Sequence, residues 1–464
     1  MNMKNVILSE KNIPLYGEYD VVVVGGGTAG AVAAISAGRE NLKTLVIEQF
    51  GSLGGSQTNA LVHPIMPSFI KGNPITSSIC SDIHKRMVEI GAAVNDDGPR
   101  DRFFDPNGFF NGTQLKVVLE TMALEVGCKL LYHTRLIDVI KENNRIEYIV
   151  IHNKNGLSAV KAKTYIDCTG DADLAYISGV PCNSGDTNGV NSSMTLRFEM
   201  ANVDMEKLSD YLIAGGQTEF IHYPTLHVDD FGWCPEFRRF VLEKHHLGEL
   251  THHDICHLQF FSIPGKPKSL SFNCPELGNG KNLIDADNLS KKQTEGKIAI
   301  KRITDFMKKY IPGFENAYIS QIAPMLGLRE TRRIEAEYIF NETDVFNYRK
   351  FADGIASNNF FIDVHGEDNS NRDKGYVDLP EEQKYYEVPY RSIVPKGIDN
   401  LLVAGRCAGL SFYGEATVRV QRTCRAMGEA AGIAAALAIA EDIPFRDVDG
   451  REVKKIMCLR GAEL

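Results

Sequence analysis

Two short apolar runs near the start of the chain predict buried parallel strands. Val21 to Val24 is continuously apolar and β-branched, which suits a strand that is covered on both faces of a sheet. A second run, Thr44 to Ile47, is followed directly by an acid, Glu48. The stretch between the runs is rich in alanine and is typical of a helix that packs on the sheet. We therefore expect a strand, a helix and a second strand in one unit.

Three glycines fill the turn between the first strand and the helix. Gly25, Gly27 and Gly30 form the pattern G-x-G-x-x-G, which permits a tight turn, lets a pyrophosphate approach the main chain and allows close helix packing. The helix N-terminus directs its free N–H groups at that phosphate. A carboxylate at Glu48 accepts hydrogen bonds from a ribose without a 2′-phosphate, which favours FAD or NAD over NADP. The alternative is a glycine-rich turn beside a surface glutamate.

The residues after this unit favour FAD over NAD. In GSLGGSQTNALVHPIMP, the bare amides of Gly54 and Gly55 and the hydroxyls of Ser56 and Thr58 lie along the path of a cofactor longer than NAD. A plain NAD domain does not need these groups. The sequence therefore predicts FAD.

Two later stretches resemble a known family. AKTYIDCTGDADLAYISGVP places Thr169, Gly170 and Asp171 at the end of a strand expected from Lys161 to Thr169. It resembles the second FAD-contacting turn of the glutathione-reductase-like flavoproteins, and more closely the FAD-dependent oxidoreductases related to fumarate reductase. The stretch YEVPYRSIVPKGIDNLLVAGRCAGLSFYGEATVRVQRTCRAMGEAAGIAAALAIA resembles the returning segment of that group, with a strand, a loop and a small-residue helix. With LGLRETRRIEAEYIF and FIDVHGEDN, the resemblance covers nearly the whole chain.

The resemblance implies a non-covalently bound FAD and positions residues around it. Glu48 would contact the adenosine ribose, and Leu136, on a strand expected from Lys129 to Val139, would lie near the adenine. Gly405 and Arg406 would lie near the ribityl and pyrophosphate groups.

The small-residue helix is expected to begin near Arg419 and to point at the pyrimidine side of the flavin. A cation and a helix N-terminus there would stabilise the negative charge of the reduced ring. Arg422 and Arg425 stand where the family carries Pro and Met, and Glu429 replaces a common Gln. This basic start indicates an anionic or polyhydroxylated substrate. The alternative is a buried helix whose arginines reach solvent, with Arg425 and Glu429 forming an exposed pair worth about 0.2–0.5 kcal/mol.

The positions of the FAD motifs define the domains. They lie at residues 20–60, 129–171 and 385–440, so the FAD-binding domain must be discontinuous. We expect an α/β fold with a Rossmann-like FAD-binding domain at 1–184 and 376–464. An inserted α+β substrate or cap domain, 185–375, carries Trp233, the polar loop GEDNSNRDKG and SLSFNC, which reads as a strand.

Catalytic candidates come from the family-like segments. A hydride-transferring flavin needs a neighbour that moves a proton and cations that fix an anionic or carbonyl group. The candidates are His365, Arg329, Arg333, Arg391 and Tyr413. His365 could equally orient a turn beside a glycine, and the arginines of RETRR could form structural ion pairs with nearby glutamates.

A histidine-rich stretch, HHLGELTHHDICHLQFF, offers a possible zinc site only if it is helical. His253 and His257 are four residues apart, with Asp254 and Cys256 between them. ICHLQFF reads better as a strand, which separates these side chains. We therefore predict no metal, and assign the histidines to solvent or to substrate contacts.

Composition narrows the partners. The chain has 464 residues and a net charge of −9, from 51 Lys and Arg against 60 Asp and Glu, without a long basic run. Nucleic acid and acidic membrane surfaces are therefore excluded as bulk partners. We expect no membrane span and no signal peptide. Ten cysteines without a C-x-x-C pair suit reduced thiols in the cytoplasm.

The sequence thus predicts an FAD-dependent oxidoreductase that transfers a hydride between its flavin and a small organic substrate, held between the FAD domain and the cap. A flavin monooxygenase is the first alternative. An electron-transfer flavoprotein subunit resembling heterodisulfide reductase is the second, although cysteine clusters for iron–sulfur ligation are lacking. A second G-x-G-x-x-G is also lacking, so an NAD(P)H domain is not expected. The electron donor or acceptor and the oligomeric state stay open.

Overall fold

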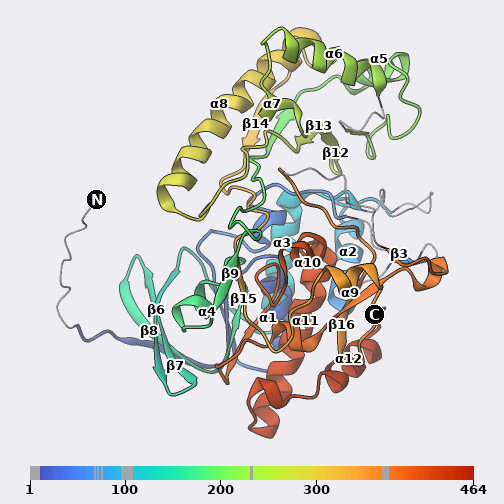
Figure 1. Ribbon diagram of the computed structural model, residues 1–464. Helices are drawn as coiled ribbons and strands as arrows, with labels where there is room; N and C mark the ends of the chain where they lie inside the picture. The colour runs from blue at the N-terminus through green and yellow to red at the C-terminus, as the bar shows by residue number, and fades with distance from the viewer. Residues whose placement is uncertain are drawn as a thin grey trace.

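The protein consists of two bodies, one above the other in Figure 1. The lower body contains the first strands and the C-terminal helices, and the upper body contains helices α5 to α8 with a small sheet. The computed structural model describes residues 11–66, 77–95, 108–229, 234–366 and 376–464, and the backbone of two short strands, β3 (Phe69–Ile70) and β4 (Asn73–Pro74).

The lower body is built on a seven-stranded sheet in the order β5-β2-β1-β8-β7-β6, with β18 also paired to β8. Its strands are β1 (Leu15–Val24), β2 (Thr44–Ile47), β5 (Lys129–Leu131), β6 (Arg135–Glu142), β7 (Arg145–Asn153), β8 (Gly156–Asp167) and β18 (Leu401–Val403). Neighbouring strands in the series β5-β2-β1-β8 pair in parallel, and so do β8 and β18. The pairs β8–β7 and β7–β6 are antiparallel. Val24 pairs with Ile47 and Asp167, and Val403 also pairs with Asp167, so these four strands end at one edge.

The predicted buried strands are confirmed, with one correction. Val21 to Val24 and Thr44 to Ile47 are buried parallel strands, as the apolar runs indicate. The single strand expected from Lys129 to Val139 is wrong. The chain breaks at His133, which has φ 51°, because β5 pairs parallel with β2 whereas β6 turns to pair antiparallel with β7.

Two small-residue helices, α1 (Thr28–Arg39) and α11 (Gln421–Glu441), pack against each other below the sheet edge. A Cβ at Gly428 would lie 2.2 Å from the carbonyl oxygen of Ala29, so only glycine permits this approach. By length and composition α11 is the one helix in the described ranges that could cross a membrane, but 78% of its apolar window is buried inside the molecule. This apolar stretch is therefore part of the core of the lower body.

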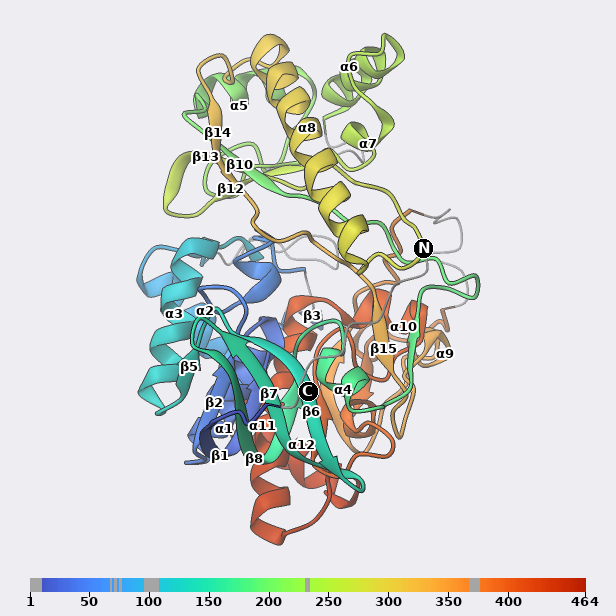
Figure 2. The ribbon, with the colours of Figure 1, turned by 90° about the vertical axis from the view of Figure 1, so that its left-hand side faces the viewer.

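The upper body is an antiparallel five-stranded sheet in the order β11-β12-β13-β10-β14, covered by helices. Its elements are β10 (Phe198–Ala201), α5 (Met205–Ala214), β11 (His227–Val228), α6 (Pro235–His246), α7 (His252–Ile255), β12 (Phe260–Ile263), β13 (Lys266–Phe272), α8 (Ala286–Tyr310) and β14 (Tyr318–Ile322). Figure 2 shows α8 running upward from the junction between the bodies, beside this sheet. Buried side chains of α8, such as Ile300 and Met307, join Phe198 and Phe272 in a separate core. The inserted sheet domain is therefore confirmed.

The two hydrophobic cores divide within the expected insertion 185–375, whose boundaries stay a prediction. Apart from Leu61, the core of the upper body comes from Met194 to Leu326, whereas Phe340, Ile355 and Ile362 pack in the core of the lower body. The lower body also contains α2 (Ser78–Glu89), α3 (Gly112–Glu125), α4 (Asp173–Ile177), β9 (Cys182–Ser184), β15 (Arg332–Ile334), α9 (Glu342–Phe346), β16 (Gly354–Asn358), β17 (Tyr386–Pro389), α10 (Phe412–Val418) and α12 (Gly450–Leu459). Trp233 and residues 367–375 of the polar loop lie outside the described residues.

Candidate functional site

A cavity of about 1470 Å³ lies where the strand ends of the lower body face the upper sheet. Most of the residues predicted to bind the cofactor line it: Gly25, Gly27, Glu48, Gly55, Leu136, Thr169, Gly170, Asp171, Gly405, Arg406 and Arg419. From the upper body come Arg197, Phe261 and Arg329, among others. One cavity thus joins the predicted cofactor motifs to the cap.

The three glycines of the first turn have three different surroundings. Gly25 has φ 91°, and a Cβ there would lie 2.5 Å from the carbonyl oxygen of Cys168. A Cβ at Gly30 would lie 1.8 Å from the carbonyl oxygen of Gly25, so the helix packs directly on the strand end. A Cβ at Gly27 would meet nothing closer than 3.8 Å. Gly27 therefore leaves open space beside the main chain, as a bound pyrophosphate requires.

Glu48 is buried at the end of β2 and is held by main-chain donors. Its Oε2 accepts a hydrogen bond from the N–H of Gly26 at 2.7 Å, and its Oε1 accepts one from Phe50 at 2.8 Å. Burial raises the pKa of this carboxyl, and the backbone donors act in the opposite direction. Glu48 and Leu136 both line the cavity. Their contacts to a ribose and an adenine stay predictions.

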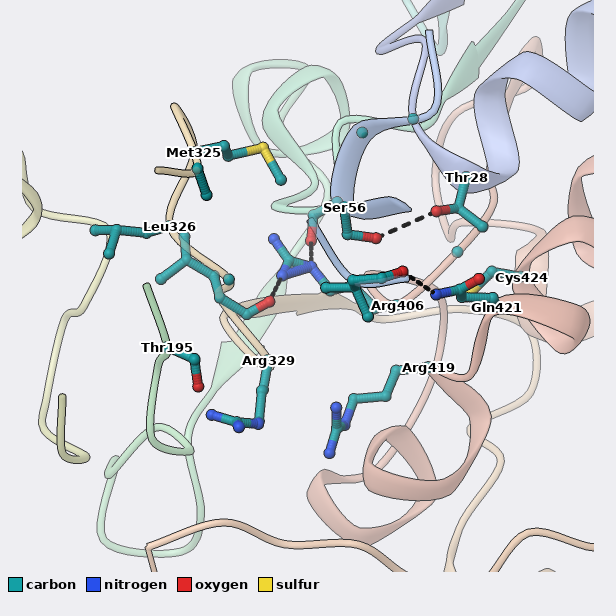
Figure 3. A pocket seen from close by; sticks show the side chains of 18 of the residues that line it. Thr28, Ser56, Thr195, Met325, Leu326, Arg329, Arg406, Arg419, Gln421 and Cys424 are labelled. Carbon is teal, nitrogen blue, oxygen red and sulfur yellow. Dashed lines mark hydrogen bonds between the residues drawn. The ribbon is translucent and has the colours of Figure 1, made fainter. Parts of the chain in front are cut away.

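The double-glycine loop presents one of its two predicted hydroxyls to the cavity. Gly55 lines the cavity, whereas Gly54 does not. Thr58 is buried, does not line the cavity and donates to the carbonyl oxygen of Leu53 at 2.7 Å. Ser56 lines the cavity instead, and its Oγ lies 3.3 Å from Oγ1 of Thr28 (Figure 3). The exposed hydroxyl of this loop is therefore that of Ser56.

Arg406 joins the Thr169–Asp171 turn to the segment that returns from the cap. Its Nε donates to the carbonyl oxygen of Gly170 at 2.8 Å, and its Nη2 pairs with Asp171 at 2.6 Å. Its Nη1 donates to the carbonyl oxygen of Leu328, and Asp171 also accepts from Thr331 at 2.6 Å. Figure 3 shows this guanidinium in the middle of the site. All three of its nitrogens are thus bonded to protein groups.

Arg419 lines the cavity but does not begin the long helix. It is the C-terminal cap of α10, and α11 begins at Gln421 after Val420 as its N-cap. The Nη2 of Arg419 donates to the carbonyl oxygen of Asp363 at 2.8 Å and lies 3.1 Å from its carboxylate. The helix end therefore reaches the cavity through Val420 and Gln421, and Arg419 is a separate cation with its own acid partner.

His365 is held between two carboxylates from different parts of the chain. Its Nδ1 lies 2.7 Å from Oε1 of Glu276, and its Nε2 lies 3.1 Å from Oδ2 of Asp363. Arg329 approaches the same Glu276 oxygen at 3.3 Å and donates to the carbonyl oxygen of Ser193 at 2.6 Å. Figure 3 shows Arg329 and Arg419 on the same side of Arg406. The structure thus gathers the predicted His365, Arg329 and Arg419 into one charged cluster.

Burial and charge set the protonation of this cluster. Burial raises the pKa of Glu276, but the hydrogen bond with His365 and the charge of Arg329 outweigh it, so this pKa is lowered. The ring of His257 lies edge-on to that of His365, with centroids 4.9 Å apart. Burial, with the positive charges of His365 and Arg329, lowers the pKa of His257 to about 3. Glu276 is therefore ionised and His257 neutral near pH 7.

Two other catalytic candidates lie away from the cavity, and these predictions are corrected. Arg391 does not line the cavity; its side chain is 50% exposed and pairs with Asp353 at 2.9 Å. Tyr413 is 41% exposed and also does not line it. Arg333 is buried in an ion pair with Glu330, as the structural alternative for RETRR proposed. The segments that carry these three residues pack in the lower body, away from the cavity, and the family-like motifs alone do not show this.

Arg425, in the basic start of α11, serves neither of the roles considered for it. Arg425 is buried, and its Nη1 lies 3.4 Å from the sulfur of Cys80. Glu429 is also buried and accepts from the hydroxyl of Ser78 and, at 3.0 Å, from the N–H of Ile79. These residues therefore bind α11 to the first turn of α2. Neither the exposed pair nor a substrate contact by Arg425 is found.

The histidine-rich stretch forms no metal site within the described residues. His253 and Asp254 lie in the short helix α7, and the carboxylate of Asp254 is occupied by Arg302 at 2.6 Å. The strand expected at ICHLQFF is shorter than predicted, because β12 begins only at Phe260. His257 lies between the two elements and is a cavity residue.

Sequence patterns missed two acids and a cation at this junction. Glu276 and Asp363 stand in loops, where periodicity gives no signal. Arg197 did leave a signal, because Met194, Leu196, Phe198 and Met200 alternate with polar residues in SSMTLRFEM. That alternation places Arg197 on the face opposite the core, and here that face is the cavity wall.

Comparisons with known proteins agree with this site. The sequence pattern of the family described as FAD dependent oxidoreductase matches residues 20–457. Digeranylgeranylglycerophospholipid reductase from Methanococcus aeolicus is 24% identical over 201 residues, which cover 41% of this chain and 47% of that protein. Dihydrolipoamide dehydrogenase from Chaetomium thermophilum is 40% identical over 72 residues, or 16% of this chain and 14% of the relative. The matches thus span less than half the length of these relatives.

Solved structures show lower similarity over more of the chain. A geranylgeranyl bacteriochlorophyll reductase-like protein from Thermoplasma acidophilum has a TM-score of 0.47 and 15% identity, covering 96% of this chain and 84% of that one. The p-nitrophenol 4-monooxygenase of Pseudomonas putida has a TM-score of 0.48 and 10% identity, covering 96% and 87%. The narrower relationship to fumarate reductase stays a prediction. Because the family pattern spans nearly the whole sequence and its motifs line one cavity, this chain belongs to the FAD-dependent oxidoreductases, and FAD is its cofactor.

Proposed function

We propose that the protein transfers a hydride between non-covalently bound FAD and a small organic anion held at the junction of the two bodies. One observation carries the proposal: a single cavity is lined on one side by the glycine turn and on the other by the cluster of His365, Arg329 and Arg419. A site for a neutral, apolar substrate would not need two arginines and a histidine at its wall.

The lower body supplies a cradle that suits the cofactor. Gly27 and Gly55 expose bare main chain to the cavity, and the buried carboxylate of Glu48 lies at the same wall. Bound FAD supplies a two-electron hydride acceptor or donor. Arg406 holds the Thr169–Asp171 turn at this wall through its bonds to Gly170 and Asp171.

The cluster supplies charge and a proton-transfer group. Arg329 and Arg419 are each held by a carboxylate, Glu276 and Asp363 respectively, so both guanidinium groups have fixed positions. Fixed cations orient an anionic group better than mobile ones. Reduction of a carbonyl or imine consumes a proton with the hydride, and His365, a cavity residue whose two ring nitrogens both lie beside carboxylates, is the group placed to donate it. Oxidation of an alcohol or amine would run through the same group in the opposite direction.

The test is a reduction screen on the purified holoprotein. Oxidised flavin is mixed without oxygen with pools of small organic acids and with neutral compounds, and the flavin absorbance is followed. We expect one class of acid to bleach the flavin, or to reoxidise flavin that was reduced beforehand. Bleaching by neutral compounds alone would contradict an anionic substrate. A colourless protein that does not take up FAD would remove the basis of the proposal.

The electron partner is tested in the same preparation. The chain carries one G-x-G-x-x-G motif, so we expect slow flavin reduction by NADH and NADPH compared with reduction by the substrate or a carrier. Rapid, saturable NADPH oxidation that consumes oxygen and yields a hydroxylated product would favour the monooxygenase instead. Acid or heat should release FAD from the protein, because the attachment is proposed to be non-covalent.

A further inference from the structure

Arg197 is a buried cation at the upper wall of the cavity, and no acid among the described residues pairs with it. Its side chain precedes β10, is 3% exposed and lines the cavity. Its Nε and Nη2 are buried and make no hydrogen bond to any residue in the described ranges, and no carboxylate there forms an ion pair with it. Burial lowers its pKa to about 9, and the charge of Arg329 contributes. Arg197 therefore still carries its charge at neutral pH.

Such a charge is costly unless an anion compensates it. The neighbouring buried arginines are compensated, since Arg329 contacts Glu276 and Arg333 contacts Glu330. The nearest acid along the strand, Glu199, does not pair with Arg197: its Oε2 pairs with Lys266 at 2.9 Å, and its Oε1 lies 3.7 Å from Nε2 of His63. The missing partner of Arg197 must therefore come from outside the described chain or be absent.

The surroundings of Arg197 combine one polar group with an aromatic wall. The guanidinium lies over the ring of Phe261, 5.3 Å from its centroid. The ring centroid of Phe261 lies 6.3 Å from that of Phe109 and 5.0 Å from that of His227. Thr195, two residues earlier on the same face, lines the cavity, and its buried Oγ1 has no partner within the part of the chain that the structure describes.

We propose that Arg197 binds the carboxylate of the substrate, whose carbon skeleton is apolar or aromatic and lies against Phe261 and Phe109. This inference rests on the proposed function and narrows its substrate class to an organic carboxylate with an apolar body. Arg197 is then the residue that selects the anion, whereas Arg329 and Arg419 already have acids of their own. The cofactor phosphates belong to the opposite wall, at Gly27.

The experiment uses the FAD-loaded protein with benzoate and phenylacetate as probes and benzamide as a neutral match for benzoate. Binding is measured by calorimetry and by the change in flavin absorbance, so turnover is not required. We expect a carboxylate to bind and benzamide to bind far more weakly. Arg197→Met should weaken carboxylate binding by about 30-fold or more, because it removes one partner of a buried charge pair. Arg197→Lys should keep part of the affinity.

Arg391→Met is the matched control, since Arg391 is an arginine outside the cavity. Its affinity for the probes should equal that of the unchanged protein. Failure of both carboxylates to bind, or equal binding to Arg197→Met, would overturn the inference. Loss of FAD from Arg197→Met would also overturn it, by assigning the arginine to the cofactor.

The free energy of unfolding, measured without added carboxylate, is a second readout. It would change if Arg197 had a structural role. If Arg197 awaits an external anion, Arg197→Met should be at least as stable as the unchanged protein and should no longer be stabilised by the bound probe. A clear loss of stability would mean that Arg197 holds the fold together, which would contradict the inference. Failure of the proposed function is distinguishable, because probe binding is measured whether or not any substrate reduces the flavin.

Discussion

The two walls of the cavity differ in the kinds of groups that they present. The lower wall is made of bare main chain at Gly27 and Gly55 and of polar groups that already bond to the protein, such as Glu48 and Arg406. The upper wall and the junction present long charged side chains, and Arg197 has no partner in the described chain. The polar groups of a cofactor-binding wall can have protein partners before the cofactor binds. A substrate-binding wall can leave a charged side chain without a protein partner until the substrate binds, and this lowers the stability of the unliganded protein.

The largest expected effects separate two glycines of the same turn. Gly27→Leu should remove FAD, lowering affinity by at least about 100-fold, because its side chain would occupy the phosphate space. Gly27→Ala should fold normally, since its Cβ meets nothing closer than 3.8 Å. Gly30→Ala should fail to fold, because its Cβ would lie 1.8 Å from the oxygen of Gly25. FAD content and circular dichroism of the apoprotein check these outcomes. Full FAD binding by Gly27→Leu would place the phosphate elsewhere.

At the junction, Glu276 is expected to be the most sensitive side chain. Glu276→Gln leaves Arg329 and His365 without their shared negative charge, which should cost about 3–5 kcal/mol of unfolding free energy. The lowered pKa of Glu276 means that its contribution is complete above pH 4.5 and is lost as the pH falls further.

Urea titrations at pH 7 and pH 3 measure this effect. The two proteins should differ most at pH 7 and converge in acid. Glu249→Gln is the control, because Glu249 lies at the surface beside Lys309. A constant difference at both values would mean that the charge of Glu276 is not what stabilises the cluster.

The same contrast explains what the sequence could predict. The lower wall comes from contiguous motifs, so Gly25, Gly27 and Glu48 were found by spacing alone, and all three line the cavity. The junction brings Glu276 and Asp363 together from loops 87 residues apart in the sequence, and this meeting depends on how the two bodies pack. No local pattern encodes it.

The errors have equally physical causes. Arg391 and Tyr413 were chosen because they stand in family-like stretches, but each faces away from the cavity. Arg419 was expected to start the long helix, but α10 ends at Val418, and Arg419 and Val420 separate the two helices. Propensity does not resolve a break of two residues between two helices.

A moderate effect is expected from Glu415, a buried acid that feels the charges of three arginines. Burial raises its pKa from 4.5 to about 7, although Arg419, Arg333 and Arg406 act against this. Its contribution to stability is therefore present below pH 4.5 and lost as the pH rises through 7, by up to about 3 kcal/mol. Glu415→Gln should flatten this loss. Urea unfolding at pH 5 and pH 8 with saturating FAD checks it, and an unchanged slope would assign the pH dependence to other groups.

The smallest expected effect tests Arg419 as a cation for the reduced flavin. Arg419→Met should lower the reduction potential while leaving most FAD binding intact, because the glycine turn that receives the phosphates is unchanged. Asp363 lies 3.1 Å from the guanidinium and offsets part of its charge. The shift should therefore be about 30 mV, equivalent to about 1.4 kcal/mol for two electrons.

Equilibration with reference dyes measures this shift in potential. Sulfite, whose flavin adduct is also anionic, should bind more weakly to Arg419→Met. Arg391→Met should change neither quantity, since its partner Asp353 lies with it outside the cavity. An Arg419→Met protein with unchanged potential and sulfite affinity would show that this arginine serves only to hold Asp363 beside His365.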